Sequence, residues 1–215
     1  MIEIKKLLLY FAFALSLSLT TFYAKAENSD HVYLELNYGI STNEFSVTSS
    51  KGDITTDEED EGFIISAGRM FGGFWGVDIM YYDLGSSSIT VDSGDIIKME
   101  QVEYVAESSG TISNDISGYG TGLILGNTSG PLTAYLKIGM QAWEKGGSST
   151  ILDNDDGFKK DFYNKGLGGY GGIGIAFNLS ENTAIDLSGD IIGLSNDGGF
   201  SNNSSLLSAG LRFSF

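Results

Sequence analysis

The chain has 215 residues, enough for one domain or two, and its 30 glycines with a single proline disfavour both a helical protein and a proline-rich disordered one. It contains no cysteine, which excludes a disulfide framework, a thiolate metal site, a thiol nucleophile and a lipoprotein anchor. With 12 Lys and Arg against 28 Asp and Glu, the formal charge is −16. We expect no nucleic-acid partner, because phosphate binding needs a basic patch.

Residues 1–26 have the three parts of a secretory signal peptide. Two lysines supply the positive charge, an apolar stretch follows, and Ala24 and Ala26 are the small residues that signal peptidase needs. The alternative is an uncleaved membrane anchor, but the apolar run of 7–19 is shorter than the roughly 20 residues that a span requires. We therefore expect cleavage after Ala26 and export of a mature domain of residues 27–215.

Eight segments alternate between apolar and small or polar residues with a period of two, which is typical of β-strands. They are residues 31–41, 62–71, 75–84, 116–126, 132–143, 165–179, 183–193 and 207–215. The phase is less clear in the second segment than in the others. In the last, "LSAGLRFSF", every second residue back from Phe215 is apolar. The sequence thus predicts eight strands that each have one apolar face.

The connections between these segments alternate strictly between short and long. Three are tight turns, and four are long and hydrophilic, roughly residues 42–61, 85–115, 144–165 and 194–205. In an up-and-down antiparallel sheet this places all short turns at one end and all long loops at the other, as in outer-membrane barrels. The segments are about 9–12 residues long, near the length that a tilted strand needs to cross a membrane.

These features predict an all-β fold, an eight-stranded antiparallel up-and-down transmembrane β-barrel, whose closure leaves no unpaired edge in lipid. Side chains nearly fill the interior of so small a barrel. Aromatic residues near the strand ends fit two interfacial girdles. They are Tyr38, Phe71, Trp75, Tyr81, Trp143, Phe177 and Phe215. The alternative is a soluble periplasmic barrel or sandwich, such as a lipocalin-like barrel, in which the apolar faces would point inward.

Four stretches, "GVDIMYYDLG", "ISGYGTGLILG", "AYLKIGMQAWE" and "LSAGLRFSF", resemble the transmembrane domain of OmpA-type outer-membrane proteins. The resemblance covers about residues 30–215. It implies both termini in the periplasm and insertion by the barrel-assembly machinery, which recognises a last strand that ends in an aromatic residue. Leu211, Phe213 and Phe215 match that assembly signal. Full-length OmpA-type proteins also carry a peptidoglycan-binding domain after the barrel, so we expect the tethering function to be absent here unless a partner supplies it.

The same resemblance implies a network of charges that plugs or gates the lumen. Asp78 matches the acid of the third strand and Lys137 a base of the fifth, whereas Asp186 stands where the family has a base. Six charged residues are expected to face the lumen: Glu35, Asp78, Lys137, Asp186, Asp190 and Arg212. Buried charges must be paired or hydrated, so a structural polar core is favoured over the alternative, a narrow cation-selective pore.

No catalytic, cofactor or metal site is expected. Small outer-membrane enzymes, such as lipid A deacylases, palmitoyltransferases and omptin-type proteases, use a histidine, but the single histidine of this chain, His31, stands at a strand start. The acidic stretch 153–157 has a turn glycine but lacks the spacing of a calcium loop, and both it and the acidic stretch 55–62 are expected to be solvated loops. Bridging of such loops to lipopolysaccharide by divalent cations is the alternative.

The long segment 88–108 contains β-branched residues and a turn at 92–95, which predicts a hairpin that extends the third and fourth strands beyond the membrane. An exposed strand edge there could recruit another chain.

The sequence therefore predicts a structural protein of a Gram-negative outer membrane, with long acidic extracellular loops, that serves envelope integrity or surface interaction. The alternatives are a narrow cation-preferring channel and an adhesin or serum-resistance protein. Expected partners are outer-membrane lipid and lipopolysaccharide, the barrel-assembly machinery during biogenesis, and an extracellular protein.

Overall fold

The computed structural model describes residues 30–43, 47–52, 54–99, 102–106, 108–127, 131–150, 160–195 and 201–215. The expected signal peptide, with Ala24 and Ala26, and the acidic stretch 153–157 lie outside these ranges. Within the described ranges, no helix is long and apolar enough to cross a membrane.

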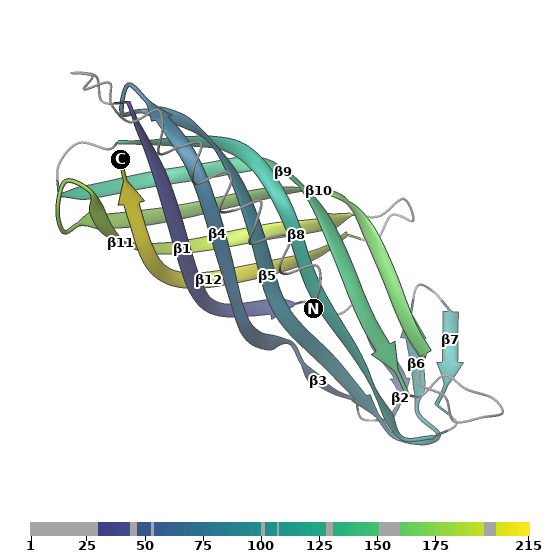
Figure 1. Ribbon diagram of the computed structural model, residues 1–215. Coiled ribbons are helices and arrows are strands. Elements are labelled where there is room, and N and C mark those ends of the chain that lie inside the picture. Colours follow the sequence, from purple (N-terminus) through teal and green to yellow (C-terminus); the bar gives the residue numbers. More distant parts are fainter. Residues whose placement is uncertain are drawn as a thin grey trace.

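Eight long antiparallel strands form a closed barrel (Figure 1). They are β1 (His31–Asn43), β4 (Glu59–Phe71), β5 (Trp75–Val91), β8 (Gly110–Asn127), β9 (Leu132–Ser149), β10 (Lys160–Asn178), β11 (Thr183–Ser195) and β12 (Ser201–Ser214). Each pairs with the next of the eight, and β12 pairs with β1, which closes the ring. The predicted all-β, eight-stranded up-and-down barrel is confirmed.

The apolar face of the alternation points outward. Leu207 is 74% exposed, Met140 67% and Ile173 66%, whereas the neighbouring side chains of Ser208 and Gln141 are buried. A large apolar surface outside and polar groups inside suit a barrel in lipid and reverse the arrangement of a soluble barrel. The lipocalin-like alternative, which needs inward apolar faces, is therefore excluded.

Some outward aromatic residues, such as Phe71, Trp75 and Phe177, lie at strand ends, whereas one predicted member of the girdles does not face outward at all. Phe71 and Trp75 flank the first short turn with ring centroids 4.6 Å apart. The assignment of Trp143 to a girdle is wrong, because its side chain is 3% exposed and packs inside the barrel in the same cluster as Tyr82. Since β9 runs on to Ser149, position 143 is in mid-strand on the inward face.

The strands run past their predicted ends on the long-loop side of the barrel. β5 and β8 stay paired from Ser86↔Asp115 to Val91↔Gly110, so the expected extension of these two strands is present. The hairpin expected within segment 88–108 is not formed by β5, because the strand after the turn at 92–95, β6 (Ile96–Met99), pairs with β2 (Val47–Lys51) and β7 (Val102–Val105) instead. The acidic stretch 55–62 is not a loop, because it forms β3 (Thr55–Asp57), which pairs with β5, and the start of β4. The barrel wall therefore continues well beyond the lipid-spanning segments.

A second sheet lies at the long-loop end of the molecule (Figure 1). It consists of β2 (Val47–Lys51), β6 (Ile96–Met99) and β7 (Val102–Val105), in the order β2-β6-β7. Within the described strands, β2 and β7 each pair on one side only. This sheet therefore offers two strand edges outside the membrane.

Two apolar clusters fill the barrel interior. The smaller, toward the short turns, consists of Tyr33, Met70, Ile124 and Tyr135. The larger, toward the long loops, consists of Ile64, Met80, Tyr82, Leu84, Ile116, Trp143, Tyr170, Ile192, Leu194 and Leu206. On β9, Lys137 lies between Tyr135 of the smaller cluster and Trp143 of the larger. A charged layer therefore separates the two clusters.

Candidate functional site

The charged layer is built around Glu35, whose side chain is fully buried. Lys137 Nζ donates a hydrogen bond of 2.7 Å to Glu35 Oε1, and Arg212 Nε donates one of 2.8 Å to Oε2. Arg212 Nη2 also donates to Oε2, so the guanidinium binds this oxygen through two nitrogens. Both carboxylate oxygens thus have a charged partner, which is the condition for keeping an ion in a dry interior.

Asp186 forms the other side of the Arg212 site. Its Oδ2 lies 3.2 Å from Arg212 Nη2, and its Oδ1 accepts hydrogen bonds from Tyr135 Oη at 2.6 Å and from Asn37 Nδ2 at 3.1 Å. The guanidinium carbon lies 4.4 Å from the ring centroid of Tyr135 and 5.1 Å from that of Tyr33. Arg212 is therefore held by two carboxylates and two aromatic rings.

Asp78 and Asp190 are held differently. Tyr170 Oη donates a hydrogen bond of 2.9 Å to Asp78 Oδ1, and Ser188 Oγ donates one of 3.0 Å to Asp190 Oδ2. Within the described part of the chain, no lysine or arginine nitrogen lies within 4.0 Å of either carboxylate. These two acids therefore rely on hydroxyl groups rather than on ion pairs.

The structure places all six predicted lumen residues inside the barrel, and the most exposed, Arg212, is only 8% exposed. Glu35, Lys137, Arg212 and Asp186 are in direct contact, and Asp78 and Asp190 flank them. Four carboxylates against two cations leave two excess negative charges in this layer. Sequence reasoning missed the hydroxyl and amide donors of this layer, which are Asn37, Tyr135, Tyr170 and Ser188.

The other predicted residues lie at the short-turn end. His31 is opposite Met70 at the start of β1, away from the charged layer. Phe213 and Phe215 are exposed on the outer face, and the backbone N–H of Phe215 donates a 2.8 Å hydrogen bond to the carbonyl of Val32. Leu211 is likewise exposed, so the apolar face of the last strand is available to lipid. Within the described ranges, no group of three or more His, Cys, Asp or Glu residues could hold a metal ion.

A clamp between β4 and β5 stands beyond the lipid-spanning segments. Asp60 Oδ2 accepts hydrogen bonds from Ser86 N at 2.6 Å and from Ser86 Oγ at 2.9 Å. It holds a register shift between Asp83 and Ser86, where Gly85 adopts a φ of 67° that favours glycine. The backbone N–H groups of Ser86 and Glu61 lower the pKa of Asp60 below its usual value.

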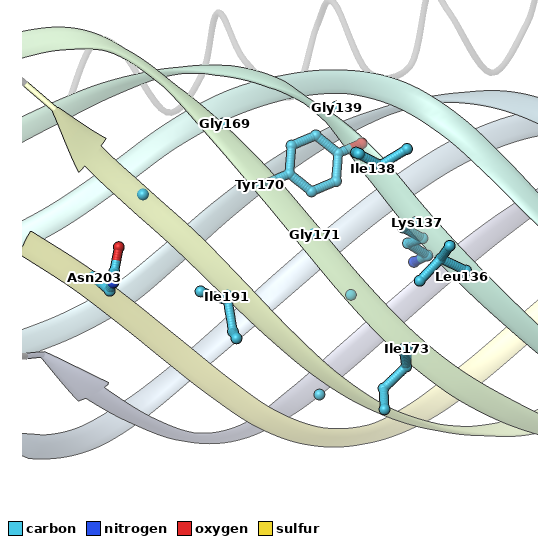
Figure 2. A pocket seen from close by; sticks show the side chains of 13 residues that line it. Leu136, Lys137, Ile138, Gly139, Gly169, Tyr170, Gly171, Ile173, Ile191 and Asn203 are labelled. Carbon is cyan, nitrogen blue, oxygen red and sulfur yellow. The ribbon is translucent and has the colours of Figure 1, made fainter. Parts of the chain in front are cut away.

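A shallow hollow of about 800 Å³ marks the outer wall over β9, β10 and β11. Figure 2 shows Leu136, Ile138, Ile173 and Ile191 around it. Its floor includes the outward glycines Gly169, Gly171 and Gly189. Because the isoleucine and leucine side chains are exposed on the outer face, this hollow faces lipid and not the lumen.

Fold and interior together define a small membrane-spanning β-barrel with a charged layer in its interior. The sequence matches the family described as "Outer membrane protein beta-barrel domain" over residues 11–213, so the chain belongs to this family. It is accordingly a protein of the outer membrane. A search of curated protein sequences gives no match.

Solved structures with the same kind of fold are distant in sequence. A major outer membrane protein from Thermus thermophilus is 12% identical, with a TM-score of 0.52 and coverage of 87% of this chain and 100% of that one. Neisserial surface protein A is 19% identical, with a TM-score of 0.48 and coverage of 86% and 97%. Ail, the attachment invasion locus protein of Yersinia pestis, solved in complex with the heparin analogue sucrose octasulfate, is 16% identical, with a TM-score of 0.47 and coverage of 86% and 99%.

Proposed function

We propose that this protein is a non-conducting structural barrel of a Gram-negative outer membrane, which supports envelope integrity and presents a surface for interaction outside the cell. The observation that carries the proposal is the ion pair between Glu35 and Lys137. β1 and β9 are four strands apart in a ring of eight, so this pair crosses the lumen from one wall to the other. An open pore would need this bridge to be absent or broken.

Further hydrogen bonds support a closed lumen on the long-loop side of that bridge. Tyr82 Oη donates to Gln141 Oε1 at 2.6 Å, which connects β5 to β9. Gln141 Nε2 donates to the carbonyl of Gly193 at 2.8 Å, which connects β9 to β11. The large apolar cluster lies at the same level, and Trp143 and Leu206 belong to it. Within the described part of the chain, side chains therefore cross the lumen at two levels, the charged layer and this second set of contacts.

The extracellular part supports the second half of the proposal. The sheet β2-β6-β7 presents two strand edges, and an extended segment of an extracellular protein could pair with either. The acids of 57–61 make the adjoining surface negative. The outer face would contact lipid and lipopolysaccharide, and Leu211, Phe213 and Phe215 would be read by the barrel-assembly machinery. We also propose that the protein is not an enzyme, because His31 lies apart from the charged layer.

Conductance in planar bilayers tests the closed lumen. Purified, refolded protein should give no resolved current steps at moderate potentials, and regular cation-selective steps would overturn the proposal. Glu35→Ala is the matched variant, because loss of the bridge should allow brief openings. The competing function, a narrow cation-preferring channel, is favoured by the four carboxylates against two cations in the layer, and it predicts steps in the unmodified protein.

A deletion strain tests the envelope role and the surface role separately. Loss of the whole protein should increase sensitivity to detergent, and a variant lacking residues 96–105 should restore resistance because its barrel is intact. The same variant should lose binding to extracellular material if the β2-β6-β7 sheet is the interaction surface. Normal detergent resistance in the deletion strain would remove the envelope role, and unchanged binding by the shortened variant would remove the role of the sheet.

A further inference from the structure

The charged layer contains more negative than positive charge, and the excess is localised. Glu35 and Asp186 have ion-pair partners. Asp190 and Lys137 lie on either side of Gly172 in the sheet, so Asp190 faces the ammonium across a residue that has no side chain. Asp78 has one hydroxyl donor and, within the described residues, no ion pair. An ionised carboxylate that is 3% exposed needs a compensating charge.

Asp78 lies in the middle of one hydrogen-bonded row of inward residues. On one side the row continues through Gly122 and Gly139 to Tyr170, whose ring covers both glycines and whose hydroxyl reaches Asp78 Oδ1. On the other side it continues through Gly68 to Tyr33. A Cβ built at Gly68 would lie 2.5 Å from Tyr33 Oη, so this hydroxyl lies over Gly68, which is the register partner of Asp78.

Only one of the two tyrosines donates a hydrogen bond to Asp78. Tyr170 binds one carboxylate oxygen, whereas Asp78 Oδ2 and Tyr33 Oη are both buried without a hydrogen-bond partner. Ser66 Oγ, two residues before Gly68 on the same face of β4, is a third buried oxygen without a partner. Each such atom costs free energy unless a further species contacts it. The guanidinium carbon of Arg212 lies 5.1 Å from the ring centroid of Tyr33, on which the hydroxyl stands.

We propose that the barrel interior binds a sodium-sized monovalent cation between Asp78 Oδ2 and Tyr33 Oη, with Ser66 Oγ as a further oxygen ligand. Oxygen atoms from one carboxylate and two neutral hydroxyls are ligands that a small hard cation prefers, and a single carboxylate matches a single charge. The bound ion would compensate the charge of Asp78 and give its Oδ2 a partner. The inference is independent of the proposed function, because an ion held at this site would be present in a closed barrel as well as in a conducting one.

Thermal unfolding in two salts tests the site. Protein refolded in neutral detergent should unfold at a higher temperature in sodium chloride than in N-methyl-D-glucamine chloride of the same ionic strength, since the larger cation cannot enter. Asp78→Asn should abolish this difference, whereas Asp190→Asn, the same change at the other unpaired acid, should retain it. Equal midpoints in the two salts would overturn the proposal, and so would a difference that persists in Asp78→Asn.

A second measurement keeps the proposal testable where Asp78→Asn fails to fold. Bound sodium broadens the ²³Na resonance, and the excess relaxation should fall at least severalfold in Tyr33→Phe and in Ser66→Ala. Asp60→Asn, which alters an acid outside the barrel interior, should leave the same excess unchanged. Relaxation that responds to Asp60→Asn but not to Tyr33→Phe would assign the sodium to the surface and overturn the interior site.

Discussion

Glu35 and Lys137 lie on opposite walls of the barrel, and their 2.7 Å ion pair spans the lumen. Arg212 binds the second oxygen of the same carboxylate. Within the described part of the chain, Glu35 is thus the acid that contacts both buried cations, so its removal takes an ion-pair partner from each of them.

Glu35→Ala should therefore destabilise the barrel strongly. The change leaves the ammonium of Lys137 without its ion-pair partner and Arg212 with Asp186 alone, and breaking a buried pair typically costs about 3–5 kcal/mol. Urea unfolding of protein refolded in lipid vesicles measures the effect. Asp190→Asn is the control, because it leaves neither Lys137 nor Arg212 without its ion-pair partner. It should change the free energy of unfolding by less than about 1 kcal/mol. Similar losses in the two variants would contradict the central role of Glu35.

Inward and outward glycines should respond oppositely to the same substitution. In Gly122→Ala the new Cβ would lie 2.5 Å from the carbonyl oxygen of Ile138 and would collide with the hydroxyl of Tyr170, so we expect a loss of about 1–3 kcal/mol. In Gly189→Ala the Cβ would meet nothing within 4 Å, so we expect a neutral effect or a gain of about 0.5 kcal/mol. The same vesicle unfolding assay compares them. Equal losses would show that the tyrosine packing over glycine is not what requires Gly122.

The clamp at Asp60 should open in acid. Its pKa is lowered mainly by the Ser86 backbone N–H, so the stability it gives is complete above the unfolded-state pKa of about 3.9 and is lost as the pH falls through the lower folded value. The protection factor of the Ser86 amide, which compares its exchange rate with that of an unstructured amide at the same pH, should fall below that range when followed by NMR. Asp60→Asn should lower the same protection factor at neutral pH as well. A protection factor that stays unchanged at low pH would show that backbone pairing alone holds the bulge.

The strands of the lipid-spanning part could be predicted because lipid imposes a rule on every second residue. Outward positions such as Leu207 and Ile173 must be apolar there, and the period of two is then visible in the sequence. Past the lipid, the rule ends. Residues 144–149, "EKGGSS", have no apolar face, yet backbone pairing to β8 and β10 keeps them in β9. The wrong assignment of Trp143 to a girdle has the same cause. Because residues 144–149 show no alternation, the sequence does not reveal that the strand continues beyond Trp143.

The charged layer shows a similar limit. The alternation of inward and outward side chains within each strand predicts from the sequence alone that Glu35, Lys137 and Arg212 lie in the interior. Which of them meet depends on the stagger between strands around the ring, and no local pattern records it. The row from Tyr33 through Gly68 to Asp78 is equally invisible, because it joins three strands through a glycine that has no side chain to mark the contact.

The apolar end of β12 leads to a prediction about assembly rather than stability. If the proposed recognition of β12 by the barrel-assembly machinery holds, Phe215→Asp should lower the amount of protein in the outer membrane, because β12 would lose an aromatic residue of the proposed signal. Phe177→Asp is the matched control, since Phe177 is also an exposed aromatic near the short-turn end, at 44% against 51% for Phe215, but lies on β10. Both variants place a carboxylate on the lipid-facing wall, so both should refold in detergent with similar yields. Immunoblots of outer-membrane fractions should show a severalfold lower level for Phe215→Asp than for Phe177→Asp. Equal levels would contradict a role of Phe215 in assembly beyond that of other exposed aromatic residues.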